Sequence, residues 1–326
     1  MRAPCRFTLI LLALVAFVTF AAHGAHAQSY PTRPLRLIVP FPPGGTADII
    51  GRPLAQRLRE TLGQSVVVDN RGGAGGVVGT ALVAKSPPDG YTLLLGANGS
   101  LTISPNLGKL PYDPLTELTP IGTVATGQFL LAVHPSVPAR NVDALVKLAR
   151  SRPGTLRFGS AGSGNPGHLA GELFKSIAGV NMIHIPYKGA GPMSVELMAG
   201  QVDLGFAGVS SFVPHVQAGR VRALAVTSLR RSDVLPELPT LNEAGLVGYE
   251  VSTFWGVLTA ARLPREMLQR LSVAVTEAAR HPELRDMYIK GGNDPATSTP
   301  DEFAARLRTD IAKWGAVIRT AGIKEE

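Results

Sequence analysis

Twice along the chain, a short apolar segment leads into a glycine-rich loop and then into a segment whose apolar residues keep helical spacing. The first of these units spans residues 35–62 and the second spans residues 156–178. Alternation of strands and helices is typical of α/β domains, in which a mainly parallel sheet carries helices on both faces. Ligands of such sheets bind beyond the carboxyl ends of the strands. The two units therefore predict two α/β domains whose glycine-rich loops face a shared cleft.

The N-terminal segment has the three parts of a secretory signal peptide. Arg2 and Arg6 make its start positive, residues 9–18 are unbroken apolar, and residues 25–27, Ala-His-Ala, match a cleavage pattern. An uncleaved membrane anchor is disfavoured, because this apolar run is too short to span a bilayer. We predict cleavage near Ala27 and export of the remaining chain.

Composition narrows the classes of function. The 326 residues include 32 Lys and Arg against 24 Asp and Glu, a formal net charge of +8. The basic residues are spread along the chain without a run or interleaved aromatics, so nucleic-acid binding is not predicted. An anionic small ligand suits the same positive balance. The single cysteine, Cys5, lies in the signal segment, so no disulfide is expected in the exported chain.

The first glycine-rich loop, residues 41–48, has the features of an anion-binding turn. Glycines allow backbone N–H groups to point together, and the helix that follows adds a partial positive charge at its N-terminus. A plain strand-to-helix turn capped by Thr46 would explain the same pattern and stays open as the alternative. The candidate ligand-binding residues of this loop are Phe41, Pro43, Gly44, Gly45, Thr46 and Asp48.

The second loop, residues 159–168, has glycines at 162, 164 and 167, which is the G-x-G-x-x-G spacing of dinucleotide-binding loops. A nucleotide site would need an Asp or Glu after the next strand, but that strand runs into residues 186–188, Pro-Tyr-Lys. A second anion-binding loop with hydroxyl donors is therefore favoured, and no cofactor is predicted. The candidate residues of this loop are Ser160, Ala161, Gly162, Ser163 and His168.

The sequence shows none of the common catalytic or metal-binding motifs. It lacks a P-loop, a G-x-S-x-G nucleophile elbow and an H-E-x-x-H pair. His168 opens a helix beside the second loop and is a candidate ligand contact, whereas His184, inside an apolar strand, is expected to be structural. Trp314 lies in an apolar helical stripe and is expected to pack in the core. Neither an enzyme nor a metal site is predicted.

Several longer motifs, each different from the others, are distributed along nearly the whole chain after the signal segment. They include I-V-P-F-P-P-G-G at 38–45, P-D-G-Y-T-L-L at 88–94 and H-I-P-Y-K-G at 184–189, with further matches at 30–31, 73–76, 160–162, 168–172, 222–227 and 243–245. In these motifs the chain resembles the periplasmic substrate-binding receptors of tripartite tricarboxylate transporters, the Bug-type receptors of proteobacteria. One departure is Ala207-Gly208, where the family often has Asp-Asn. This departure disfavours an amino-acid ligand and favours apolar or neutral bulk near Ala207.

The resemblance implies an α/β clamp of the two-domain, periplasmic-binding-protein-like (type II) kind. Crossing strands would join the domains, and a ligand carboxylate would be held between the two loops. After the signal peptide, residues 1–27, it implies residues 28–128 as the first part of domain 1, 129–250 as domain 2 and 251–326 as the return to domain 1. Further cleft-facing positions of the family are Asn98, Ser100, Tyr187 and Lys188.

The resemblance also implies the partners. A monomeric periplasmic protein would bind a small carboxylate and deliver it to membrane transporter subunits. A ligand-sensing receptor for a membrane sensor kinase would have the same sequence features and stays open as the runner-up. An exported α/β enzyme is the alternative from a different class.

Overall fold

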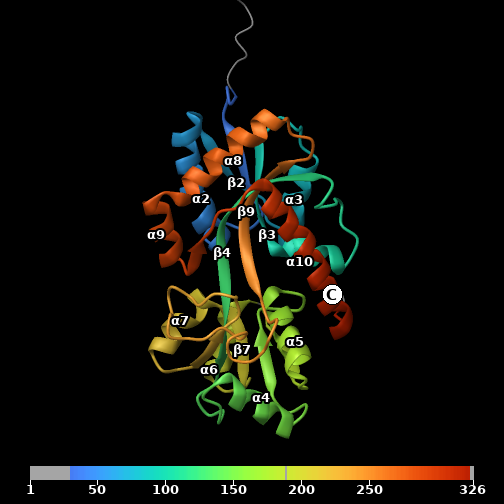
Figure 1. Ribbon diagram of the computed structural model, residues 1–326, viewed down its shortest axis with the longest axis vertical. Coiled ribbons are helices and arrows are strands. Elements are labelled where there is room, and N and C mark those ends of the chain that lie inside the picture. The colour runs from blue at the N-terminus through green and yellow to red at the C-terminus, as the bar shows by residue number, and fades with distance from the viewer. Residues whose placement is uncertain (1–29, 188, 324–326) are drawn as a thin grey trace, which may run out of the picture.

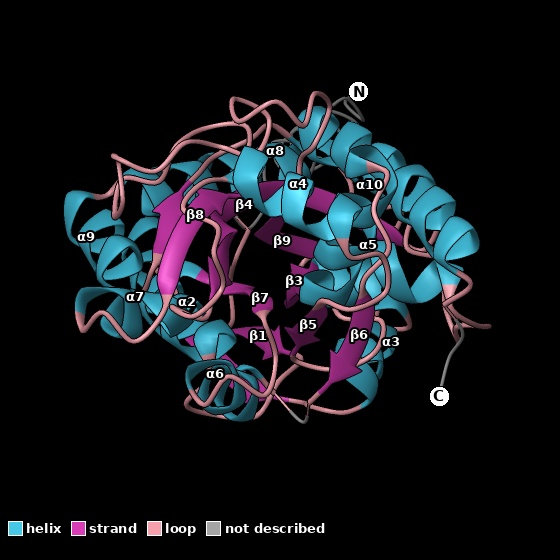
Figure 2. Ribbon diagram, turned by 90° about the horizontal axis from the view of Figure 1, so that it is seen from below, coloured by secondary structure: helices cyan, strands magenta, loops and turns pink. Residues whose placement is uncertain are grey.

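The computed structural model describes residues 30–187 and 189–323, which form two lobes joined by strands that run from one lobe into the other (Figure 1). The predicted signal peptide, residues 1–27, and Lys188 lie outside the described residues. Seen along the long axis of the molecule, helices surround the central strands (Figure 2). The predicted α/β clamp architecture is confirmed in this arrangement.

The first lobe is built on three parallel strands. β1 (Leu35–Val39) lies between β2 (Val66–Asn70) and β3 (Thr92–Ala97). The helix after β1 buries Ile50, Leu54 and Leu58 and ends at Gly63, whose φ of 70° is left-handed and suits glycine. The helices of this lobe are α2 (Thr46–Leu62), α3 (Val77–Ala84), α8 (Arg265–Arg280) and α9 (Pro282–Lys290).

The second lobe repeats the strand–loop–helix unit. β5 (Arg157–Ser160) lies parallel to both of its neighbours, β6 (Ile183–Pro186) and β7 (Leu204–Gly208). β8 (Arg222–Val226) belongs to the same lobe. Its helices are α4 (Val142–Ser151), α5 (Pro166–Ala178), α6 (Ala190–Met198) and α7 (Val209–Gln217).

Two strands cross between the lobes. β4 (Leu118–Val133) pairs with β9 (Ser252–Ala260) as far as Gln128, and from Phe129 onward it pairs with β7 and β8. All of these pairings are antiparallel. For β4 and β9 this follows because β4 enters the second lobe and β9 returns from it. The predicted mainly parallel sheets are therefore corrected to mixed sheets, with the parallel pairs on the outer strands. The change of partner after Gln128 supports the domain boundary at 128/129, which stays a prediction.

The C-terminal helix is a further connection between the lobes. α10 (Pro300–Ala321) buries Phe303 and Leu307 in the apolar core of the first lobe, and Trp314 and Ile318 in that of the second. The expectation that Trp314 packs in the core is confirmed, because its side chain is 1% exposed. The short strand β10 (Asn293–Pro295) precedes α10 and pairs antiparallel with β4. α10 therefore runs beside the crossing strands and contacts both lobes (Figure 1).

Candidate functional site

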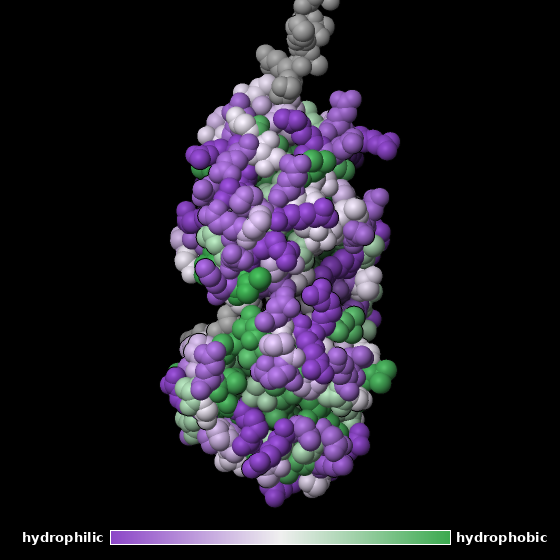
Figure 3. Space-filling view, turned by 60° about the vertical axis from the view of Figure 1, so that its left-hand side comes forward, coloured by the Kyte–Doolittle hydropathy of each residue, from purple (hydrophilic) through white to green (hydrophobic). Residues whose placement is uncertain are grey.

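A cavity of about 560 Å³ lies between the lobes, at the level where the molecular surface narrows to a waist (Figure 3). Its walls come from the ends of β1 and β3, from short turns of the first lobe, from the loop before α5, and from β9. This position beyond the carboxyl ends of parallel strands is the one that the sequence predicts. The lining residues are Phe41, Ala74, Gly75, Ala97, Asn98, Gly99, Ile103, Ser104, Leu107, Ser163, Gly164, Asn165, Pro166, Thr253 and Trp255.

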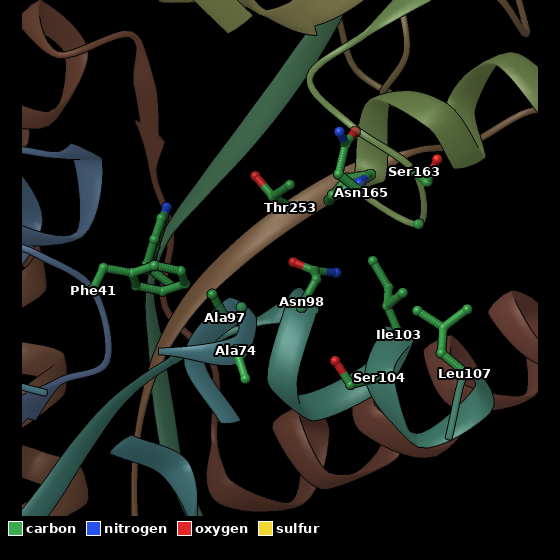
Figure 4. A pocket seen from close by; sticks show the side chains of 15 residues that line it. Phe41, Ala74, Ala97, Asn98, Ile103, Ser104, Leu107, Ser163, Asn165 and Thr253 are labelled. Atoms are coloured by element: carbon green, nitrogen blue, oxygen red, sulfur yellow. The ribbon is translucent and has the colours of Figure 1, made fainter. Parts of the chain in front are cut away.

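Asn98 follows β3 directly and is a polar group of the cavity whose position the fold fixes. Its amide oxygen accepts a hydrogen bond from the backbone N–H of Phe254 at 2.7 Å, which fixes the buried side chain against β9. Its amide nitrogen reaches the Ser252 carbonyl at 3.5 Å, the outer limit of a hydrogen bond. This nitrogen is therefore free to donate to a ligand, and Figure 4 shows the amide between Thr253 and Ile103.

Apolar side chains form two sides of the cavity. On one side, the rings of Phe41 and Trp255 pack edge to face with centroids 5.9 Å apart. On the other side lie Ile103 and Leu107, as Figure 4 shows for the labelled residues. The turns that carry much of this lining are η1 (Ala74–Gly76), η2 (Gly99–Ile103) and η3 (Ser104–Asn106).

The loop of the second lobe is closed by its own side chains. The Asn165 amide oxygen accepts hydrogen bonds from the N–H groups of Gly167 at 2.7 Å and His168 at 3.1 Å, and its amide nitrogen donates to the Gly162 carbonyl at 2.7 Å. Pro166, the first residue of α5, has no N–H group to offer. The first turn of α5 is therefore already capped by the protein itself.

The loop of the first lobe is different. The N-cap of α2 is Gly45, and within the described residues no side chain caps the first turn, so the alternative of a Thr46 cap is wrong. The Asp48 carboxylate accepts the Gly44 N–H at 3.1 Å, Arg52 at 2.8 Å and Asn70 at 3.1 Å. The hydrogen bond from Arg52 is the main reason that the pKa of Asp48 lies below its usual range. The Asp48 N–H already donates to the Gly45 carbonyl at 2.9 Å. In the part of the chain that the structure describes, the N–H groups of Thr46 and Ala47 have no partner, and they remain available to an anion.

Two histidines support the second loop from behind. The rings of His168 and His184 stack with centroids 3.6 Å apart. His184 Nε2 lies 2.7 Å from the Ser160 hydroxyl, and His168 Nδ1 accepts the Gly164 N–H at 3.0 Å. Burial lowers the pKa of His184 to about 3, so this side chain is neutral at neutral pH. The expected structural role of His184 agrees with these contacts.

The structure sorts the predicted site residues into three groups. Phe41, Asn98 and Ser163 line the cavity. Four lie exposed on the loop that continues from Phe41: Pro43, Gly44, Gly45 and Thr46. The other described ones lie outside the lining: Asp48, Ser100, Ser160, Ala161, Gly162, His168, Tyr187 and Ala207.

Three of the residues outside the cavity lining show why they do not face the cavity, because their side chains are engaged elsewhere. The Ser100 hydroxyl is bonded to Thr80 at 2.8 Å, the Ser160 hydroxyl contacts His184, and Ala207, a residue of β7, is buried in the apolar core of the second lobe. These side chains therefore support the walls from behind. A direct ligand contact from this group stays a prediction, and Lys188 lies outside the described residues.

Several lining residues were not predicted from the sequence. Ala74 and Gly75 belong to a glycine-rich run, 73–76, which resembles the family motif and is the one signal that could have placed them. Ile103, Leu107 and Trp255 reach the cavity through the fold of the lobes, and no local pattern marks them.

A second cavity, of about 500 Å³, lies on the other face of the crossing strands. Ser252 lines it, whereas Thr253 lines the first cavity, because successive side chains of a strand point to opposite faces. Here Gln128 of β4 donates to the Asp294 carboxylate of the first lobe and accepts a hydrogen bond at 2.8 Å from the Ser228 hydroxyl of the second. Burial raises the pKa of Asp294. We call Asp294, Gln128 and Ser228 the rear bridge.

The charge of the first cavity is distinctive. Among its described lining residues, none has a charged side chain.

In the described part of the chain, no group of three or more His, Cys, Asp or Glu residues is placed to hold a metal ion. Residues 30–187 and 189–323 contain no helix long and apolar enough to cross a membrane.

Two α/β lobes, crossing strands between them and a cavity that both lobes line define a solute-binding receptor with the periplasmic-binding-protein-like fold. The family model described as the tripartite tricarboxylate transporter family receptor matches residues 50–323. BugT of Bordetella pertussis is 36% identical over 303 residues, which cover 91% of this chain and 92% of BugT. The chain belongs to the tripartite tricarboxylate transporter receptor family.

Solved structures agree with this assignment. R. palustris Rpa4515 with adipate is 37% identical, with a TM-score of 0.76 over 90% of this chain and 99% of the other. MatC (Rpa3494) from Rhodopseudomonas palustris with bound malate is 28% identical, with a TM-score of 0.71 over 89% and 100%. The family consists of the periplasmic receptors of tripartite tricarboxylate transporters, so this protein is a solute-binding receptor. The prediction that it is not an enzyme is confirmed by this family assignment.

Proposed function

We propose that this receptor captures a small carboxylate in the cavity between its lobes and delivers it to a membrane transporter. The observation that carries the proposal is that both lobes and β9 line one cavity. A ligand that contacts both lobes favours the closed arrangement by its differential affinity for that arrangement. The adipate and malate bound by the two R. palustris relatives support a carboxylate as the ligand.

The carboxylate is assigned to the first-lobe side of the cavity. At the start of α2, the N–H groups of Thr46 and Ala47 have no partner among the described residues and lie at the positive end of the helix dipole. The Asn98 amide nitrogen is a further donor. Hydrogen bonds to a carboxylate are charge-assisted and therefore strong. The second loop, whose helical N–H groups are capped by Asn165, contributes through Ser163 and through closure over the ligand.

The remaining proposals concern the whole protein. The signal peptide is removed near Ala27, and the exported chain acts as a monomer in the periplasm. Residues 28–128 and 251–326 form one domain and residues 129–250 the other, which the change of strand partner at Gln128 supports. The membrane partner is a transporter of the tripartite tricarboxylate type, which the family description supports.

Calorimetric titration of the purified protein tests the proposal. Adipate, malate, benzoate and hexanoate serve as probes, after unfolding and refolding to remove any compound carried over from the cells. We expect at least one of them to bind. Asn98→Asp keeps the oxygen that accepts the Phe254 N–H but replaces the donor with a negative charge, so binding should weaken at least about tenfold.

Asn242→Asp is the matched control. The Asn242 amide oxygen accepts the Gly248 N–H at 2.9 Å, so the same exchange keeps its contact, and Asn242 lies outside the cavity. This variant should bind as the wild type does. A folded wild-type protein that binds none of the carboxylates would refute the proposed function, and unchanged binding by Asn98→Asp would remove Asn98 from the site.

A further inference from the structure

The backbone of the loop before α5 does not by itself fix the shape of this loop. Glycine occupies positions 162, 164 and 167, and Gly162 and Gly164 have positive φ values of 139° and 69°. Glycine adopts many backbone conformations, so a loop of this composition is flexible unless other groups restrain it. Ser163, Gly164 and Asn165 of this loop line the cavity, as Figure 4 shows for Ser163 and Asn165. The shape of this cavity wall therefore depends on the side chains that hold the loop.

His168, in the first turn of α5, holds the middle of the loop. Its Nδ1 accepts the Gly164 N–H at 3.0 Å. A backbone N–H can only donate, so this contact requires an Nδ1 without a proton and places the proton of the neutral ring on Nε2. Nε2 lies 3.8 Å from Oε1 of Glu172, which is paired with Lys175 at 2.8 Å. Both ring nitrogens are therefore directed toward protein groups, and His168 lies outside the cavity lining.

The ring of His168 is itself fixed on the core of the second lobe. It stacks on the ring of His184 with centroids 3.6 Å apart, and His184 stacks in turn on Phe158 at 4.8 Å. Phe158 is a fully buried residue of β5. Helix α5 can approach β5 this closely because residue 171 is a glycine, since a Cβ at that position would overlap the Phe158 ring. The stack therefore positions Nδ1 of His168 from the core side of the loop.

We infer that His168 is a positioning residue of the ligand site: its unprotonated Nδ1 holds the Gly164 N–H, and with it the loop that lines the cavity, in the conformation that binds the ligand. The inference rests on the proposed function, because it concerns the second-lobe wall of that same cavity. A loop that is already held in its binding conformation does not have to be ordered when the ligand binds, and this raises the affinity. His168 acts through Gly164 and needs no contact of its own with the ligand.

Asparagine and leucine at position 168 make the sharpest comparison, because they have nearly the same size and shape and only asparagine offers an acceptor at the position of Nδ1. Both variants lose the ring and its stacking. The probe for calorimetric titration is whichever of adipate, malate, benzoate and hexanoate binds the wild type most tightly. His168→Leu should bind it at least about fivefold more weakly than His168→Asn, because the Gly164 N–H then has no acceptor from residue 168 in the binding conformation. Equal affinities of the two folded variants would overturn the inference.

His134→Leu is the matched control. His134 Nδ1 accepts the Ser136 N–H at 3.3 Å, so this substitution removes the same kind of contact, and His134 lies outside the cavity. The variant should bind the probe as the wild type does. A loss of affinity in His134→Leu equal to that in His168→Leu would contradict a specific role of His168 at the cavity.

The position of the ring proton is a second test, and it needs no ligand. Nitrogen NMR of the protein with isotope-labelled histidine, at neutral pH, should show His168 with an unprotonated Nδ1 and a protonated Nε2. A proton on Nδ1 would overturn the inference whatever the variants bind. If the wild type binds none of the four carboxylates, the proposed function fails, and the ring proton still decides whether His168 holds the loop.

Discussion

Asp48 holds the first loop in shape without touching the cavity. Its carboxylate joins the Gly44 N–H, which belongs to the loop, to Arg52 of α2 and Asn70 of β2. From the sequence, Asp48 is a candidate ligand contact, because no sequence pattern distinguishes an acid that contacts a ligand from an acid that stabilises the first turn of a helix. Its partners, up to 22 residues away, show that it sets the loop geometry, and a direct ligand contact of Asp48 stays a prediction.

Asp48→Asn should lower the free energy of unfolding by about 1–3 kcal/mol, since the Arg52 contact loses its charge and one acceptor is lost. The pKa of Asp48 is lower in the folded state, so its stabilisation is present above the usual carboxylate range and is lost as the pH falls through the lowered pKa. Urea unfolding of both proteins should therefore show a difference at neutral pH that shrinks in acid. Asp113→Asn, which keeps its acceptor for the Leu115 N–H on an exposed loop, should change stability by less than about 0.5 kcal/mol.

His184 makes the second loop sensitive to acid. Its folded-state pKa of about 3 is below the unfolded value of 6.5, so the unfolded chain binds the proton first as the pH falls. The wild type should lose stability from about pH 6.5 downward for this reason. His184→Gln retains a hydrogen-bonding group near Ser160 and cannot be protonated, so its urea-unfolding free energy should decline less over the same range. Equal pH dependence in the two proteins would contradict this role.

Helix α10 packs against both lobes. It buries Phe303 in the first lobe and Trp314 in the second, and between them Arg306 donates to the Ser252 hydroxyl of β9 at 2.8 Å. Lys313 is paired with Glu250, just before β9. The helix is therefore bonded to β9 and to the segment just before it, at the level where the chain crosses between the lobes.

Two substitutions of Trp314 should separate its packing from its polar atom. Trp314→Ala should cost about 3–5 kcal/mol in the free energy of unfolding, because it leaves a cavity in the second lobe. Trp314→Phe should cost clearly less, because the buried Nε1–H has no hydrogen-bond partner among the described residues. Both values come from urea unfolding, and an equal cost for the two variants would show that the volume of the side chain is not what matters.

The elements also show what a sequence can predict. The segment with helical spacing that ends the first unit, residues 35–62, is found as the helix Thr46–Leu62, since apolar spacing and the Gly63 stop are local properties. The first half of β4 was missed, because Pro120, Gly122 and Gly127 are typical of loops, and it is pairing with β9 that makes this segment a strand. Helices α7 and α9 were missed as well; each is nine residues long, and short helices have weak periodic signals.

The candidate site divides in the same way. The two loops at the carboxyl ends of β1 and β5 could be predicted, because a strand, glycines and a helix follow one another in the chain. The roles of the two loops could not, since the Asn165 cap of α5 and the uncapped start of α2 differ by one side-chain contact. Leu107 and Trp255 are 148 positions apart in the numbering and meet at one cavity only through the crossing strands.

At the scale of the whole molecule, the rear bridge should oppose closure on a ligand. Rotation of the lobes that narrows the first cavity must widen the second, because the crossing strands lie between the two. Ser228→Ala removes the hydroxyl that bonds to Gln128, weakens the bridge and should tighten binding of the best carboxylate about two- to tenfold. Calorimetry measures this change, and small-angle scattering should show a more compact unliganded protein.

Ser86→Ala is the matched control for that prediction. The Ser86 hydroxyl donates to the Val83 carbonyl at 2.7 Å within the first lobe, so its loss touches neither cavity. Binding by this variant should equal that of the wild type. Unchanged or weaker binding by a folded Ser228→Ala protein would show that the rear bridge does not resist closure.

The alternation of Ser252 and Thr253 along β9 has an evolutionary consequence. We expect the choice of ligand to depend on side chains of one face of the strands, which line the first cavity, and the affinity to depend also on the rear bridge at the other face. Homologues that share the cavity lining but differ at Gln128, Ser228 or Asp294 should take the same nutrient at different ambient concentrations. A lineage can then adapt to scarcity or abundance by single substitutions that leave the choice of nutrient untouched.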